Sequence, residues 1–145
     1  MNKASYRPIE ILLVEDSPAD IRLTMEVLKD SKLQNTVRYV EDGDEALDFL
    51  FRRGRFDDAP KPDLVLLDLN LPKTDGREIL KVIKEDKDLC HIPVVILTTS
   101  DAEEDVLTSY ELHANCYVTK PLSLDQFVNV VYAIETFWLS IVKLP

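Results

Sequence analysis

The stretch LVLLDLNLPKTDG, residues 64–76, carries an aspartate, Asp68, at the end of an apolar run. A run of this kind is typical of a strand that is covered on both faces of a parallel sheet. A carboxylate at the end of a buried strand is costly unless a charge or hydrogen bonds compensate it. The stretch therefore predicts a buried strand over residues 63–68 and a polar site at its end.

Outward from this stretch, short apolar or β-branched segments alternate with helical patterns. Further strands are expected over residues 9–14, 35–40, 92–98 and 115–119. A first helix is expected from Pro18, with Ser17 as its N-cap, a second over 43–54, with Gly54 as its terminator, and a third over 76–86. A fourth helix is expected after the capping box of Ser100 and Glu103. The fifth should begin after the capping box of Ser123 and Gln126 and run to about residue 142. Because parallel strands need helical crossovers, these units predict an α/β fold: a doubly wound, five-stranded parallel sheet with five helices.

Length and composition indicate one globular domain. The chain has 145 residues, of which 46% are hydrophobic and 30% are charged. The net charge of −10 argues against a nucleic-acid partner, since phosphate binding depends on Lys and Arg. No apolar run is long enough to span a membrane, and the N-terminus has no apolar core of a signal peptide. We therefore expect a cytoplasmic protein with neither a nucleic-acid nor a membrane partner.

Polar residues stand at the ends of four of the expected strands. Glu15 and Asp16 follow the first, Asp68 ends the third, Thr98 ends the fourth and Lys120 follows the fifth. Open parallel sheets bind ligands at the carboxyl ends of their strands. If the first and third strands are neighbours, three carboxylates converge, and they need protons or a cation. Oxygen ligands favour Mg²⁺, and zinc is disfavoured because no His or Cys stands at these strand ends.

Each of these groups, taken singly, has an ordinary explanation. An acidic pair after a strand is usually a solvated loop or a helix cap, a threonine there a turn residue, and a lone lysine a surface group. Together they supply what phosphoryl transfer to a carboxylate requires. Asp68 would be the nucleophile, and Glu15, Asp16 and Asp68 would bind Mg²⁺. Lys120 and Thr98 would contact phosphoryl oxygens.

Four segments in order, ILLVEDSPAD, LVLLDLNLPKTDG, PVVILTTS and YVTKPL, resemble the receiver domain of two-component response regulators. The resemblance covers roughly residues 9–142 and implies the flavodoxin-like strand order 2-1-3-4-5. We expect a single receiver domain over residues 1–145, without the output domain that the family usually carries, since no residues remain to build one. Asp68 would then accept a phosphoryl group from a histidine kinase.

The same resemblance assigns further roles. The backbone carbonyl of Asn70 would complete the Mg²⁺ site, and Lys120 would act in catalysis. Thr98 and Tyr117 would form a switch that changes the surface made by the fourth helix, the fifth strand and the last helix. The segments SYELHANCYVTKPLSLDQF and IETFWL are similar to single-domain regulators of cyanobacterial and bacterial phytochromes, which implies a phytochrome-type histidine kinase as partner.

The last helix predicts a protein interface. Its apolar positions spread over roughly 220°, whereas a helix that only covers a sheet needs about 100°. The residues beyond the inner stripe are Val128, Val130, Tyr132, Phe137 and Leu139. Excess apolar surface favours a homodimer over a monomer with an apolar helix, and the downstream protein stays unknown.

Three other interpretations are open. An Mg²⁺-dependent phosphatase or phosphotransferase of the haloacid-dehalogenase type would place a second aspartate two residues after the nucleophile, where this chain has Asn70. A pseudo-receiver binding module would lack the acceptor, an acidic ligand or the lysine, and all are present. A purely structural α/β module would not explain four matched strand ends. We therefore expect no enzyme activity beyond phosphorylation and dephosphorylation of Asp68 itself.

Overall fold

The computed structural model describes residues 8–31, 34–98, 116–120, 122–127 and 129. Five parallel strands form one sheet in the order β2-β1-β3-β4-β5. They are β1 (Ile9–Val14), β2 (Asn35–Val40), β3 (Leu64–Asp68), β4 (Val94–Thr98) and β5 (Cys116–Thr119). The predicted fold class and strand order are confirmed, with strand ends within two residues of those expected.

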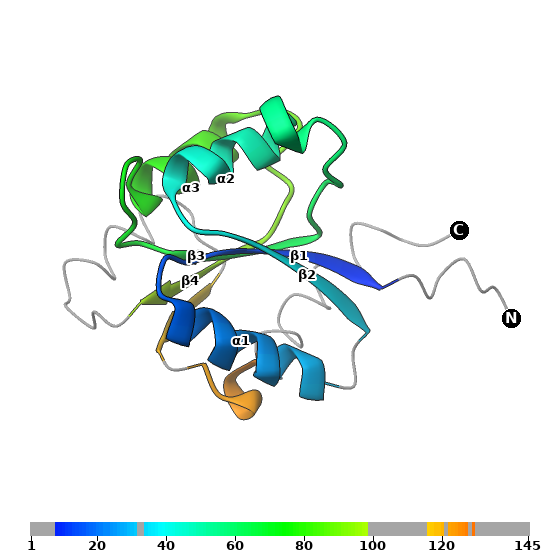
Figure 1. Ribbon diagram of the computed structural model, residues 1–145, viewed down its shortest axis with the longest axis vertical. Coiled ribbons are helices and arrows are strands. Elements are labelled where there is room, and N and C mark those ends of the chain that lie inside the picture. Colours follow the sequence, from blue (N-terminus) through cyan, green and yellow to red (C-terminus); the bar gives the residue numbers. More distant parts are fainter. Residues whose placement is uncertain (1–7, 32–33, 99–115, 121, 128, 130–145) are drawn as a thin grey trace, which may run out of the picture.

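Helices cover both faces of this sheet (Figure 1). α1 (Pro18–Asp30) lies against one face, and α2 (Gly43–Leu50) and α3 (Gly76–Glu85) lie against the other. Residues 124–127 form a helical turn on the α1 side, after the predicted capping box of Ser123 and Gln126. The helix expected after Ser100 and most of the last helix lie outside the described residues. In the described ranges, no helix has the length and apolarity that a membrane span requires.

The core forms two layers that meet at the sheet, because successive side chains of a strand point to opposite faces. In β3, Val65 and Leu67 join the apolar cluster beneath α2 and α3. Leu64 and Leu66 join the cluster on the α1 side, together with Phe127. All five residues of β3 are buried, as the apolar run predicted. The central strand β3 is thus packed on both faces, and Asp68 at its carboxyl end stands at the edge of this core.

The predicted end of α2 was wrong. The helix ends at Leu50, and the chain reverses at Arg52, whose φ is 55°. The Arg53 N–H donates to the Asp48 carbonyl at 2.8 Å, and the Arg52 N–H donates to the Phe49 carbonyl at 3.3 Å. These two bonds form a Schellman motif, with arginine at the position that usually holds glycine. Gly54 also has a positive φ, but it begins the 3-10 turn η2 (Gly54–Phe56).

Replacing Arg52 by glycine is expected to raise the free energy of unfolding by about 0.5–1 kcal/mol, because glycine adopts the left-handed conformation without a Cβ penalty. Arg52 is exposed, so little packing is lost. Urea denaturation measures the change. The control is Arg52→Ala, which removes the same side chain and keeps the backbone strain. Equal stabilities of the two variants would contradict the expectation.

Candidate functional site

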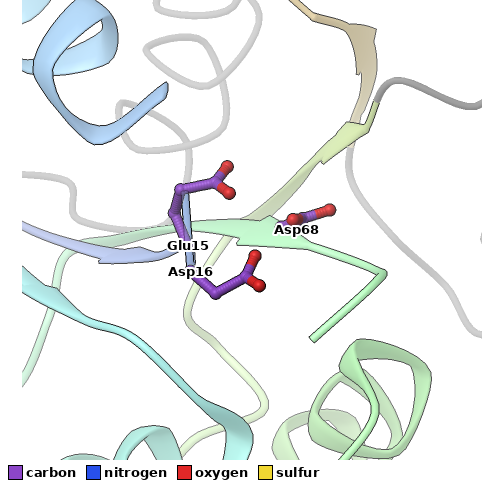
Figure 2. A group of neighbouring side chains, drawn as sticks. All are labelled: Glu15, Asp16 and Asp68. Atoms are coloured by element: carbon purple, nitrogen blue, oxygen red, sulfur yellow. The ribbon is translucent and has the colours of Figure 1, made fainter. Parts of the chain in front are cut away.

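Three carboxylates meet at the carboxyl edge of the sheet, where β1 and β3 are neighbours (Figure 2). Glu15 and Asp16 follow β1, and Asp68 is the last residue of β3. One oxygen from each lies within 4.8 Å of the others. Glu15 and Asp68 are buried, with exposed fractions of 1% and 5%, whereas Asp16 is exposed. The structure therefore brings together the three acidic residues that the strand ends predicted, with one of them open to solvent.

The turn from β1 into α1 holds the acidic pair at this edge. The Glu15 N–H donates to the Val40 carbonyl at 3.0 Å, which continues the pairing of β1 with β2. The Glu15 carboxylate accepts from the Ser17 N–H at 3.2 Å. Ser17 is the N-cap of α1, and Pro18 is its first residue, as predicted. Glu15 is thus fixed both by the sheet and by the start of the helix.

Asp68 is fixed from the other side by the start of α3. Its Oδ1 accepts from the Asn70 N–H at 3.2 Å. Gly76, the first residue of α3, packs directly on the backbone of this turn: a Cβ there would lie 2.3 Å from the Asp68 carbonyl oxygen and 2.7 Å from the Leu69 Cα. Only glycine permits this approach, since backbone atoms on both sides cannot move apart cheaply. The backbone of Asp68 is therefore held in one place.

Lys120, directly after β5, carries the cation of the site. Its Nζ lies 3.3 Å from Asp68 Oδ2 and 3.1 Å from Asp20 Oδ2, and it forms an ion pair with Glu15. The side chain is 8% exposed. An ammonium group has three N–H donors, and here each one has a carboxylate acceptor. The structure thus places Lys120 beside Asp68, as the strand ends predicted.

Asp20 was missed by the sequence analysis as a site residue. An acidic residue in the first turn of a helix has an ordinary explanation in the helix dipole. The signal was nevertheless available: Asp20 lies in the first turn of the helix that follows Glu15 and Asp16, and so at the same edge of the sheet. What the sequence did not show is that its carboxylate reaches Lys120.

Burial and charge set the protonation of the site. Burial raises the pKa of Glu15 to about 7; the hydrogen bond from Lys120 lowers it, and the charge of Asp68 raises it. Burial lowers the pKa of Lys120, but the hydrogen bond and charge of Glu15, together with Asp68 and Asp20, outweigh it, so the pKa is raised. Near neutral pH, therefore, the Lys120 ammonium is charged, whereas the pH is close to the pKa of Glu15.

The donor set fits a hard divalent cation. Within the described residues, Glu15, Asp16 and Asp68 are the only group of three or more Asp, Glu, His or Cys side chains placed close enough to share an ion. All of their donor atoms are carboxylate oxygens, which Mg²⁺, Ca²⁺ and Mn²⁺ prefer. Among the described side chains of the site, these three carboxylates and Asp20 face one ammonium, that of Lys120, and the excess charge is negative. The role of the Asn70 carbonyl as a ligand stays a prediction.

The predicted switch and interface are described only in part. Thr98 is the last residue of β4 and pairs with Thr119 of β5, but its side chain lies outside the described residues. Tyr117 is half-buried on β5 and packs against the cluster beneath α2 and α3. The predicted interface residues, Val128, Val130, Tyr132, Phe137 and Leu139, all lie outside the description.

Comparisons with known proteins agree with this geometry. Residues 11–132 match the family model "Response regulator receiver domain". The chain is 52% identical over 145 residues to the response regulator Rcp1 of Synechocystis sp., covering 100% of this chain and 99% of that protein. A crystal structure of Rcp1 in its Mn²⁺-bound form superposes with a TM-score of 0.77 at 54% identity, covering 95% of this chain and 99% of that one.

A second solved structure is that of the phosphorylated cyanobacterial phytochrome response regulator RcpA. It has a TM-score of 0.78 and 51% identity, and the match covers 92% of this chain and 96% of that one. The predicted resemblance is therefore confirmed by sequence and by fold, over the segment that contains the acidic cluster and Lys120. The chain belongs to the response regulator receiver domain family.

Proposed function

We propose that this chain is a phospho-accepting response regulator that takes a phosphoryl group from a histidine kinase onto Asp68. The observation that carries the proposal is the contact of a buried carboxylate with a buried ammonium, Asp68 with Lys120, at the edge where Glu15 and Asp16 converge. A carboxylate oxygen of Asp68 attacks phosphorus, and an O–P bond forms as the P–N bond of the kinase phosphohistidine breaks. The imidazole keeps the bonding electron pair and takes a proton.

The residues around Asp68 would divide the work of this transfer. Asp68 is oriented through both oxygens, since Oδ1 accepts from the Asn70 N–H and Oδ2 faces Lys120. Lys120 would then pair with a phosphoryl oxygen, and Thr98 would donate a hydrogen bond to another. Mg²⁺, when bound, would neutralise phosphoryl oxygens, and its ligands would be Glu15, Asp16, Asp68 and the Asn70 carbonyl. Catalysis of this kind consists mainly of positioning and electrostatic stabilisation.

The partner would be a phytochrome-type histidine kinase in the cytoplasm, because a similar protein is described as a cyanobacterial phytochrome response regulator. Thr98 and Tyr117 would change the surface that includes β5 when Asp68 is phosphorylated.

The chemistry would be a single turnover on the protein itself. A haloacid-dehalogenase-type phosphatase is disfavoured, because Asn70 stands where its general acid would be.

Phosphorylation with a labelled kinase tests the proposal. We expect a phytochrome-type histidine kinase, autophosphorylated with ³²P and mixed with this chain and Mg²⁺, to transfer its label. Borohydride reduction and mass spectrometry should then locate one acyl phosphate per chain at Asp68. Label on another residue would contradict the assignment. Steady turnover of small phosphate esters would support the phosphatase instead.

Binding of Mg²⁺ is expected to weaken as the pH falls below about 7. The raised pKa of Glu15 means that this carboxyl holds a proton below that value, and the proton must leave before the oxygen can bind a cation. The association constant should fall by up to about tenfold per pH unit below the pKa. Calorimetric titration between pH 6 and 8 measures it. Glu15→Gln should flatten the profile, and an unchanged affinity across this range would contradict the expectation.

We also propose a homodimer through the last helix, supported by the apolar residues that the sequence places outside its inner stripe. Sedimentation velocity at micromolar concentration, with and without phosphorylation, measures the state. We expect a dimer in at least one of the two conditions, because the excess apolar surface favours burial. A monomer in both conditions would exclude this interface.

A further inference from the structure

Asp20 contacts Lys120 but does not belong to the carboxylate cluster that could hold a cation. The ammonium contacts three carboxylates, and two of them, Glu15 and Asp68, belong to the cluster of three acidic side chains. Asp20 comes instead from the first turn of α1, and its Oδ2 lies 3.1 Å from Lys120 Nζ. Its own backbone N–H is capped by the Ser17 hydroxyl at 3.3 Å. The backbone that carries the Asp20 carboxylate is therefore held by the N-cap of α1.

We propose that Asp20 is a positioning residue that keeps the Lys120 ammonium beside Asp68 throughout phosphoryl transfer. The inference rests on the proposed function and names a residue that the family resemblance did not supply. Once Glu15 and Asp68 give their oxygens to a cation or to the phosphoryl group, Asp20 is the one described carboxylate partner left to Lys120. Without it, the long and flexible Lys120 side chain would have to be ordered during the transfer itself.

Asp20 also has an opposite effect, which the test must separate. Its negative charge repels an incoming phosphoryl dianion and competes with it for Lys120. Removal of the charge alone should therefore speed phosphorylation, whereas removal of the hydrogen-bond acceptor should slow it. Asp20→Asn removes the charge and keeps an oxygen acceptor of the same shape, while Asp20→Ala removes both. The difference between the two variants isolates positioning from charge.

The experiment compares phosphorylation rates with acetyl phosphate and Mg²⁺. We expect Asp20→Ala to be about five- to tenfold slower than Asp20→Asn, and Asp20→Asn to be as fast as the wild type or faster. Glu78→Gln is the matched control, because it removes one charge from the first turn of α3, where Glu78 is exposed. Its rate should equal that of the wild type. In a Lys120→Met background, Asp20→Ala should slow the reaction no further.

A second readout needs neither metal nor turnover. In NMR spectra of the metal-free protein, the buried Lys120 ammonium should give a slowly exchanging signal in the wild type and in Asp20→Asn. We expect this signal to broaden or vanish in Asp20→Ala. Equal rates of the two Asp20 variants would overturn the inference, as would an equal slowing by Asp20→Ala in the Lys120→Met background. Failure of the proposed function looks different, since the wild type itself would then accept no phosphoryl group, and both proposals would fall.

Discussion

Asp68→Asn is expected to reduce phosphoryl transfer from a histidine kinase by about a thousandfold or more, because a carboxamide is a very poor nucleophile. Asparagine has nearly the same shape, so the hydrogen bond from the Asn70 N–H can persist. The fold around the site should therefore survive. Transfer of ³²P from the kinase and from acetyl phosphate would both be measured, since the second reaction does not depend on kinase docking.

The same variant should not be less stable than the wild type. Asp68 lies within 4.8 Å of two other carboxylates, so its neutralisation removes repulsion in the metal-free protein. We expect the free energy of unfolding to stay unchanged or to rise by about 1 kcal/mol. Asp58→Asn, at an exposed position in the loop after η2, is the control and should retain full transfer. Transfer that survives Asp68→Asn would move the acceptor to another residue.

The fold was largely readable from the sequence because its strands are buried on both faces. The apolar run that ends in Asp68 predicted a parallel strand covered on both faces, and all five residues of β3 are buried. The acidic pair and Lys120 were found for a related reason: the ends of parallel strands share one edge of the sheet. Side chains at the strand ends therefore lie close together, and this does not depend on how the helices pack on the sheet.

Features that depend on packing between elements could not be read in this way. Gly54 was an obvious helix terminator, yet the chain turns earlier, at Arg52. The Phe49 and Phe56 rings, on either side of the turn at Arg52, pack with centroids 5.4 Å apart. The Asp20 contact with Lys120 likewise depends on how α1 lies on the sheet. Local sequence contains neither piece of information.

Lys120→Met is expected to destabilise the metal-free protein by about 3 kcal/mol or more at pH 8, since it leaves buried carboxylates without their cation. Methionine fills most of the volume of the lysine stem, so little of the loss comes from a cavity. Glu15 and Asp68 are the groups left behind, and both are almost fully buried. Urea denaturation measures the effect. Lys61→Met, at an exposed position, is the control and should change stability by less than about 0.5 kcal/mol.

The loss should depend on pH in a definite direction. The pKa of Glu15 is raised from 4.5 to about 7. Between these two pH values the native protein therefore holds a proton on Glu15 that the unfolded chain has lost. A group of this kind stabilises the fold at low pH, and its contribution is lost as the pH rises through the folded pKa. The hydrogen bond from Lys120 lowers this pKa, and its removal moves the pKa of Glu15 higher still. Lys120→Met should thus be closest to wild-type stability near pH 5 and furthest from it near pH 8.

Addition of Mg²⁺ separates electrostatics from packing as the cause of that loss. A divalent cation that binds the native carboxylates replaces the missing positive charge, so millimolar Mg²⁺ should restore part of the stability of Lys120→Met at pH 8. It should not restore the wild-type rate of phosphoryl transfer, because the ammonium that faces Asp68 Oδ2 is absent. If the variant were equally unstable at pH 5 and pH 8, with or without Mg²⁺, the lysine would act through packing alone. The charge balance of the site described above would then be wrong.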